Sequence, residues 1–302
     1  MEAAVLEQTL RDHPDDLASW HAYGEQLVAQ GDARGTLIRL EERRACARPA
    51  DREALGREID ALVTEHQEAW DAALPAGVTV VARRHGFPTG VAVTLSDDAP
   101  AMIEKVLQER FVTGMRIKGV KGTDDDDDED DWDEEEDWDE DDEEPDPRPV
   151  DVSALATLDL GRLVELDLSY LPIGAAGAAL LASTASSRLE TLDLRYCYIG
   201  DAGVAALAAS LRFDGLRRLH LQRNKLTAEG VRSLGLFGGL TELDLRYNPI
   251  GAEGAEALLE APFIGSLKQV QLYRDDVSDE GAAKLASATQ LSPVLRSYWR
   301  SV

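Results

Sequence analysis

The chain has 302 residues, a formal net charge of −27 and 44% hydrophobic residues. This length is enough to bury a sizeable core and to form about two domains. No apolar run approaches the roughly 18 residues that a membrane-spanning helix needs, and two cysteines are too few for a disulfide framework. The acidic balance argues against direct nucleic-acid binding, which depends on excess Lys and Arg. We therefore expect a reduced, cytoplasmic protein with no membrane partner.

The first half of the chain has the pattern of a helical segment followed by a hairpin. Apolar residues recur at helical spacing through residues 2–70, with breaks at His13-Pro14 and at Gly31-Asp32. The elements expected after the second break are helices over 36–48 and 51–74, two strands on either side of residues 85–88, and a helix over 99–110.

The charge is concentrated in one strip. Residues 124–146 hold 20 of the 58 acidic residues, so the rest of the chain has 38 acids against 31 bases, a charge of only −7. The strip has almost nothing apolar to bury and its like charges repel, so we expect it to be disordered. A Pro-rich stretch at 145–149 predicts an extended exit from it.

The second half repeats one pattern, L-x-x-L-x-L, five times, with starts 26, 27, 24 and 27 residues apart. Each copy continues with an apolar residue, a glycine and a leucine, as in Ile199, Gly203 and Leu207. The alternating part predicts a short strand, and the G-x-x-x-L part predicts a helix after a turn. The strand residues are Leu163/Leu166/Leu168, Leu189/Leu192/Leu194, Leu216/Leu219/Leu221, Leu240/Leu243/Leu245 and Leu267/Val270/Leu272.

A single strand–helix unit cannot bury its own apolar face, whereas stacked copies share a continuous core. The pattern and its period resemble the leucine-rich repeat. The resemblance implies an α/β solenoid, a ribonuclease-inhibitor-like horseshoe with its strands on the concave face. Asn224 and Asn248 stand where a side-chain amide usually satisfies the loop backbone. The other copies have Leu171, Cys197 and Asp275 there, so we expect an irregular ladder.

The repeat pattern extends in both directions. Val112, Met115 and Ile117 fit one more strand, and residues 150–163 are predicted to form the helix that leads into the strand at Leu163. The acidic strip then falls in a loop of the solenoid. At the other end, the residues expected to cover the last repeat are Leu291, Val294, Leu295, Tyr298 and Trp299.

A second resemblance lies near the start of the chain. Its residues are Leu10, Pro14, Asp15, Asp16, Tyr23, Leu27, Gly31, Asp32, Arg34, Gly35, Ile38, Arg39 and Leu40. They resemble the repeat-companion domain, a helical module at the N-terminus of bacterial leucine-rich-repeat proteins. That family has a tryptophan shortly after its tyrosine, which is missing here, so we expect Trp20 to take its place in the core. The resemblance implies architecture and no activity.

The predicted organisation has four parts. They are a helical companion module at 1–75, a hairpin, helix and first repeat-like strand at 76–123, a disordered acidic insertion at 124–149, and repeats with a C-terminal cap at 150–302.

The concave face is the first candidate site. Residues between the strand leucines should point away from the core and stack in columns, since neighbouring strands lie ~4.8 Å apart. Tyr and Arg are frequent in these columns and commonly anchor interfaces, although a solvated sheet with Asp–Arg ladders would also have this pattern. The candidate partner-binding residues are Asp193, Arg195, Tyr196, His220, Arg223, Asp244, Arg246, Tyr247, Tyr273 and Arg274.

The acidic strip is the second candidate site. It lacks the fixed ligand spacing and glycine turn of a calcium loop, so divalent cations would bind it only weakly and diffusely. Trp132 and Trp138 are not needed for solvation and could anchor the strip to a protein partner with a basic patch, or to the chain's own arginines. A bare solubilising linker is the other interpretation.

No pattern supports catalysis, a metal site or a cofactor. The histidines and cysteines lack metal-ligand spacing, and the chain has no nucleophile elbow, phosphate-binding glycine loop or dinucleotide fingerprint. His220 with Asp193 and Asp244 is the one arrangement that resembles acid–base chemistry, and it lies on an open face. The main hypothesis is a non-enzymatic scaffold that binds a protein on its concave face. The alternative is a charge-mimic or chaperone-like protein that binds a basic partner through 124–146.

Replacing residues 124–146 with a short Gly/Ser linker should leave the melting temperature unchanged or raise it. Loop length affects stability only logarithmically, and the replacement removes the strip's self-repulsion. Thermal melts of the two chains followed by circular dichroism test this. A fall of more than ~10 °C would show that the strip stabilises the fold.

Overall fold

The computed structural model describes residues 3–119, 147–184 and 188–301. The acidic strip, with Trp132 and Trp138, lies outside the described residues. The chain forms two compact units, one made of residues 1–93 and 101–116 and the other of residues 94–100 and 117–302. In the part of the chain that is described, no helix is both long and apolar enough to cross a membrane.

Helices dominate the first unit. Asp16 and Asp32 cap two of them, accepting the backbone N–H groups of Ala18 and Arg34 at 3.1 and 3.0 Å. The helices after residue 31 begin a few residues before the predicted positions, because Asp32 caps one and Pro49 opens the other. The elements are α1 (Ala3–Asp12), α2 (Leu17–Ala29), α3 (Ala33–Cys46), α4 (Pro49–Asp71), the antiparallel pair β1 (Val78–Arg84) and β2 (Phe87–Thr94), and α5 (Ala99–Val106).

The core of this unit is aromatic. Trp20 is 2% exposed and packs against Tyr23, Phe87 and Phe111, so the expectation that it lies in the core is confirmed. Its indole N–H donates to the carbonyl of Pro14 at 2.7 Å. The Tyr23 hydroxyl donates to Glu7 at 2.8 Å, and burial raises the pKa of this phenol to about 12.

The second unit is a stack of strand–helix repeats. Its strands β4 to β8 pair in parallel and in chain order, with Leu166, Leu192, Leu219, Leu243 and Val270 in one row. This register confirms the predicted repeat phase. The strands are β4 (Glu165–Asp167), β5 (Thr191–Asp193), β6 (Arg218–His220), β7 (Glu242–Asp244) and β8 (Gln269–Gln271), with β3 (Gly114–Lys118) before them.

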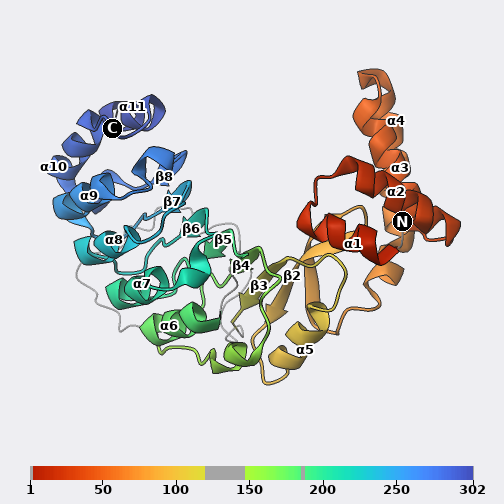
Figure 1. Ribbon diagram of the computed structural model, residues 1–302, viewed down its shortest axis with the longest axis horizontal. Helices are drawn as coiled ribbons and strands as arrows, with labels where there is room; N and C mark the ends of the chain where they lie inside the picture. Colours follow the sequence, from red (N-terminus) through yellow and green to blue (C-terminus); the bar gives the residue numbers. More distant parts are fainter. Residues whose placement is uncertain (1–2, 120–146, 185–187, 302) are drawn as a thin grey trace. The chain divides into compact units, whose positions relative to one another are not determined.

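Each strand from β4 to β8 is followed by a helix that packs on the same side of the sheet (Figure 1). The motif glycines permit close packing of neighbouring helices: a Cβ atom on Gly203 would lie 3.1 Å from Cβ of Ala178 in the helix of the preceding repeat. We call the sheet face turned away from these helices the open face. The helices are α6 (Gly174–Thr184), α7 (Gly200–Ala208), α8 (Ala228–Leu234), α9 (Gly251–Glu260) and α10 (Arg274–Ser287), and α11 (Pro293–Ser301) follows them.

The predicted helix over residues 150–163 is wrong. Only one 3-10 turn forms there, at Ser153–Thr157. The Asp159 carboxylate accepts the N–H of Gly161 at 2.9 Å, and such a local turn competes with helix formation. The chain can then bury Leu160 and Leu163 without a regular helix.

The predicted C-terminal cover is confirmed at Leu291, Leu295 and Trp299 and is wrong at Val294. This residue is 77% exposed, whereas Leu291, Leu295 and Trp299 are buried. Leu295 and Trp299 are four residues apart and share one face of α11, and Val294 falls outside that face. The side chain of Tyr298 lies outside the described part of the structure.

Leu219→Ala or Leu243→Ala should destabilise the protein by about 2–5 kcal/mol, because each truncates a buried leucine of the shared core. In a stack of repeats the loss also weakens both neighbouring interfaces. Leu211→Ala is the matched control, since its side chain is 82% exposed and should change stability by less than about 0.5 kcal/mol. Urea unfolding measures all three variants, and a wild-type midpoint for either core variant would contradict the repeat phase.

Candidate functional site

Three of the five parallel strands, β4, β5 and β7, end in an aspartate that shapes the following turn. The carboxylates of Asp193 and Asp244 each accept the backbone N–H two residues later, from Arg195 and Arg246, at 3.1 Å. Asp167 does the same with Ser169 at 2.9 Å. Such Asx turns bend the chain sharply after the strand. The residues that follow these turns, Tyr170, Tyr196 and Tyr247, point outward at the carboxyl ends of the strands.

These outward residues have left-handed backbone conformations. Their φ angles are 61° at Tyr170, 58° at Tyr196, 53° at Arg223 and 58° at Tyr247. Glycine and asparagine adopt this conformation far more readily than residues with large side chains, for which it costs about 1 kcal/mol or more of free energy. Four neighbouring repeats nevertheless carry Tyr or Arg here. Strain of this kind clusters at functional positions, which makes these residues candidates for binding.

Aromatic and cationic side chains pack together along the strand ends. The rings of Tyr170 and Tyr196 stack at 4.6 Å, and those of Tyr247 and Tyr273 meet edge to face at 4.9 Å. The Arg223 guanidinium lies 5.6 Å from the Tyr196 ring. We call these five residues the tyrosine ridge. Tyr170, Tyr247 and Tyr273 remain 48%, 49% and 40% exposed, so the ridge presents aromatic surface to solvent.

Two arginines next to the ridge are held by the turn aspartates. Arg195 Nε lies 3.0 and 2.9 Å from the two carboxylate oxygens of Asp193. Arg246 donates to both oxygens of Asp244 at 3.0 and 2.8 Å, and this hydrogen bonding raises the pKa of Arg246. Asp193 and Asp244 are predicted partner-binding residues, but these arginines cover them. Both are buried, since their arginines bond to them on the open face, and Asp244 is only 2% exposed.

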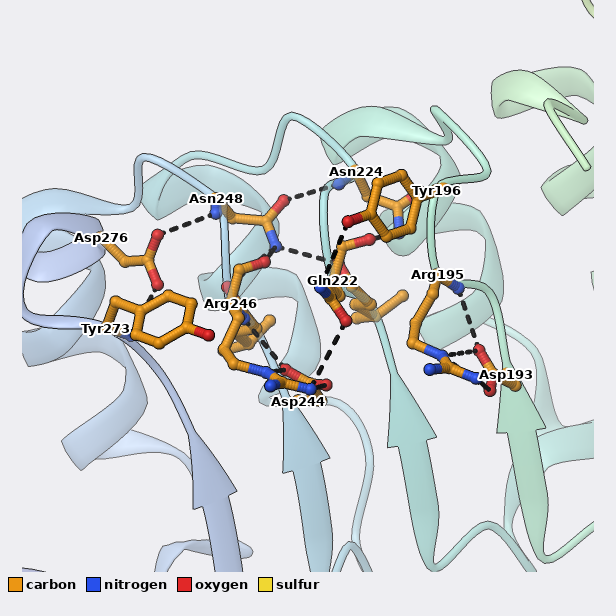
Figure 2. A network of polar contacts seen from close by, with 12 residues as sticks. Asp193, Arg195, Tyr196, Gln222, Asn224, Asp244, Arg246, Asn248, Tyr273 and Asp276 are labelled. Atoms are coloured by element: carbon orange, nitrogen blue, oxygen red, sulfur yellow. Dashed lines mark hydrogen bonds and ion pairs between the residues drawn. The ribbon is translucent and has the colours of Figure 1, made fainter. Parts of the chain in front are cut away.

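A polar chain links three neighbouring repeats (Figure 2). Arg246 donates to Gln222 Oε1 at 3.5 Å, and Gln222 Nε2 donates to the Tyr196 hydroxyl at 3.4 Å. Hydrogen bonding to Tyr273 raises the pKa of Tyr247 to about 12. The side chains are thus fixed relative to one another before any partner binds.

A second set of side chains points inward and joins the repeats. Asn224 and Asn248 donate from Nδ2 to carbonyls of the preceding repeat, Leu194 at 2.7 Å and Leu221 at 2.9 Å. Cys197 does the same through Sγ, 3.1 Å from the Leu168 carbonyl, and burial raises the pKa of its thiol. The ladder therefore continues through the cysteine.

The end of the ladder differs from the prediction. Asp276, not Asp275, accepts the backbone N–H groups of Asn248 and Tyr273, at 3.1 and 2.7 Å. The chain enters α10 directly at Arg274 and kinks at Ser278, which has a φ of 64°. The carboxylate that reaches Asn248 therefore belongs to the next residue, and Asp275 is exposed.

The structure brings most of the sequence-predicted residues onto neighbouring loops. Arg195, Tyr196, Arg223, Arg246, Tyr247 and Tyr273 lie together at the strand ends. Arg274 is exposed and forms an ion pair with Asp279 at 2.8 Å. His220 is half-buried on β6, between Asp193 and Asp244 in register, but each of these carboxylates is engaged by an arginine.

The sequence interpretation left out four residues of this surface. Tyr170 stands in the same outward column of the aligned repeats as Tyr196 and Tyr247, although it is not among the candidate binding residues. Gln222 lies in the polar chain. The others are Tyr198 and Lys225, which are also left-handed, with φ angles of 54° and 57°, and form a cation–π pair at 5.8 Å. No sequence signal distinguishes Tyr198 and Lys225 from ordinary loop residues.

The comparison with family models matches the leucine-rich repeat at residues 185–208, 216–235 and 240–259. The matched segments include Tyr196, Arg223 and Tyr247. No curated protein matches the chain. Together with the strand–helix stack, the match supports leucine-rich repeats over residues 185–259, and such repeats generally mediate protein–protein interaction. Over residues 3–119, 147–184 and 188–301, no group of three or more His, Cys, Asp or Glu side chains is placed to hold a metal ion.

Asp276 should make stability depend on pH. Burial raises the pKa of its carboxyl from 3.8 to about 6, so the folded state holds the proton more tightly than the unfolded chain does. The stabilisation of the folded state by the protonated Asp276 carboxyl is fully present below pH 3.8 and is lost as the pH rises through about 6. Relative to Asp276→Asn, the wild type should therefore gain stability as the pH falls from 7 to about 4.

Urea unfolding at several pH values measures this difference. Asp275→Asn is the matched control, because it removes an exposed neighbouring carboxylate and should run parallel to the wild type. If the free energies of unfolding of Asp276→Asn and the wild type change with pH in parallel, the raised pKa of Asp276 is contradicted.

Proposed function

We propose that this chain is a non-enzymatic scaffold that binds a protein partner on the open, concave face of a leucine-rich-repeat horseshoe, with the tyrosine ridge as its anchor. The observation that carries the proposal is the backbone strain under the ridge. Tyr or Arg occupies a left-handed position in four neighbouring repeats, where Asn or Gly would be more stable. The stability of the loop does not explain Tyr or Arg at these positions, so we attribute them to selection for a function of the side chains.

The chemistry of the ridge supports the same function. Tyr and Arg are enriched among residues that dominate binding energy, because they combine large contact area with directional hydrogen bonds. The partly exposed guanidinium groups of Arg195 and Arg246 are already held by Asp193 and Asp244. A surface that is ordered in advance loses less conformational entropy when a partner binds.

A second candidate function rests on the acidic strip. Its 20 acidic residues would favour a basic protein, with Trp132 and Trp138 as anchors, and the chain would then act as a charge mimic or a chaperone. Divalent cations would associate weakly with the same charges.

We also propose a domain organisation and a cellular location for this protein. The matching residues of the N-terminal segment support a companion module at 1–75 of a bacterial, cytoplasmic protein, and Asp16 and Asp32, two of those residues, act as helix caps. The segment 76–123 then leads into the repeats at 150–302, with the acidic insertion at 124–149 between them.

A double variant of the ridge tests the main proposal. Tyr196→Asn with Tyr247→Asn should keep the fold, because Asn tolerates the left-handed conformation, and should lose the partner, since truncating an anchor costs about 2 kcal/mol or more. The measurement is affinity capture from a lysate of the source organism, with the melting temperature as the check on folding.

The controls separate the two candidate functions. Leu236→Asn changes a large apolar residue that is 67% exposed, near the opposite ends of the strands, and should keep the partner. A chain lacking 124–146 should also keep it. If the strip deletion loses the captured proteins and the ridge variant retains them, the strip is the binding site. Binding through the strip should also weaken steeply with salt, because exposed charges are screened.

A further inference from the structure

The tyrosine ridge contains two aromatic pairs with one repeat between them. The rings of Tyr170 and Tyr196, from the loops after β4 and β5, stack at 4.6 Å. Those of Tyr247 and Tyr273, after β7 and β8, meet at 4.9 Å. Tyr196 is half-buried and the other three tyrosines are exposed, whereas the loop after β6, residues 221–227, contains no aromatic residue. The ridge therefore offers a ligand two separate aromatic surfaces along the direction in which the repeats stack.

The distance between the two pairs follows from the backbone. The parallel hydrogen bonding continues beyond the strands into the ridge, where N–H groups donate to carbonyls of the next repeat: Tyr170 to Arg195 at 2.8 Å, Tyr196 to Gln222 at 2.9 Å and Arg223 to Arg246 at 3.0 Å. Neighbouring loops are therefore one strand spacing apart, ~4.8 Å. Tyr196 and Tyr247 follow β5 and β7, which are two such steps apart, so their backbones are separated by ~9.6 Å.

A polyproline II helix has a repeat of matching length. Three of its residues make one turn and advance ~9.3 Å, so side chains at positions i and i+3 share one face at nearly the separation of the two pairs. A β-strand returns to the same face every ~6.6 Å, and one or two turns of an α-helix advance ~5.4 or ~10.8 Å. The spacing of the ridge therefore fits polyproline II best.

We propose that the tyrosine ridge binds a proline-rich segment of the partner in the polyproline II conformation, with prolines three residues apart on the two aromatic pairs. This inference rests on the proposed function. Proline-rich segments dock on aromatic side chains, and their carbonyls are open to donors because polyproline II has no internal hydrogen bonds. Tyr196 has such a donor: its hydroxyl oxygen accepts from Gln222 Nε2 at 3.4 Å (Figure 2), which leaves its O–H to donate to a peptide carbonyl.

The charges beside the ridge favour an uncharged segment. The ion pairs of Arg195 with Asp193 and of Arg246 with Asp244 are already formed, each at 2.8 Å. An acidic or basic segment would have to compete with these pairs, whereas prolines need no ionic partner. A nucleic acid is disfavoured by the net charge of −27, since its phosphates need an excess of Lys and Arg. Polyproline II is also extended before it binds, which lowers the entropy lost on binding.

Fluorescence anisotropy with labelled peptides tests the proposal on the full chain. The first peptide repeats Pro-Gln-Ala over about twelve residues, which places a proline at every third position. The second peptide has the same composition, with its prolines alternately two and four residues apart. The wild type should bind the first peptide roughly fivefold more tightly, because only its prolines reach both aromatic pairs at once.

Variants of the ridge locate the binding. Tyr196→Asn/Tyr247→Asn removes one ring from each pair and should bind the first peptide roughly tenfold more weakly. Tyr247→Asn alone should bind both peptides equally, since only one intact pair remains. Asn tolerates the left-handed backbone at both positions.

The matched control is Leu211→Asn/Leu236→Asn. It removes two apolar side chains that lie away from the ridge and are 82% and 67% exposed. Its affinities for the two peptides should equal those of the wild type, and melting temperatures confirm that all variants are folded.

Four results would overturn the inference. They are no binding of the first peptide to the wild type, equal wild-type affinities for the two peptides, an unchanged affinity in Tyr196→Asn/Tyr247→Asn, or tighter binding of an alanine-rich helical peptide. If that double variant still loses the partner in affinity capture, the ridge remains the binding site and only the proline-rich character of the ligand is discarded. If it retains the partner, the proposed function itself fails.

Discussion

The repeat stack depends on the inward-pointing hydrogen bonds between neighbouring repeats. Each turn after a strand buries backbone groups that water cannot reach, and an unsatisfied buried polar group is strongly destabilising. Asn224 and Asn248 satisfy carbonyls of the preceding repeat through their amides, and Cys197 does so through its thiol. Asp276 closes the series by accepting the N–H of Asn248. The leucine core supplies the bulk of the stabilisation, but these bonds hold the turns in register.

The same bonds create the proposed binding surface. Because Cys197, Asn224 and Asn248 point inward, the residues before them must point outward, and the tight turn gives those residues left-handed backbones. A site that needed only stability would place glycine or asparagine there. The chain instead places Tyr196, Arg223 and Tyr247, which stack along neighbouring repeats. Fold and proposed function therefore share one loop, with its inner side holding the repeats and its outer side available to a partner.

Predictions from the sequence succeeded where one periodic signal outweighed local effects. Leu192, Leu219 and Leu243 recur in a pattern that only a stacked strand satisfies, and they align in register. Predictions failed where a single local interaction decided the outcome. A side-chain turn at Asp159 prevented the helix predicted over 150–163, and the direct entry into α10 moved the ladder carboxylate to Asp276. Neither interaction has a periodic signature.

The sequence by itself determined the repeat, its phase and which residues face away from the core, because strand periodicity assigns each residue to one face. It also located Arg195, Tyr196, Arg223, Arg246 and Tyr247 on that face. Only the tertiary structure decided which of the outward residues are accessible. Asp244 is 2% exposed because Arg246 bonds to it, whereas Tyr247 is 49% exposed. Periodicity specifies a direction, but exposure depends on which side chains of the same and neighbouring repeats pack over that position, and these contacts exist only once the repeats are stacked.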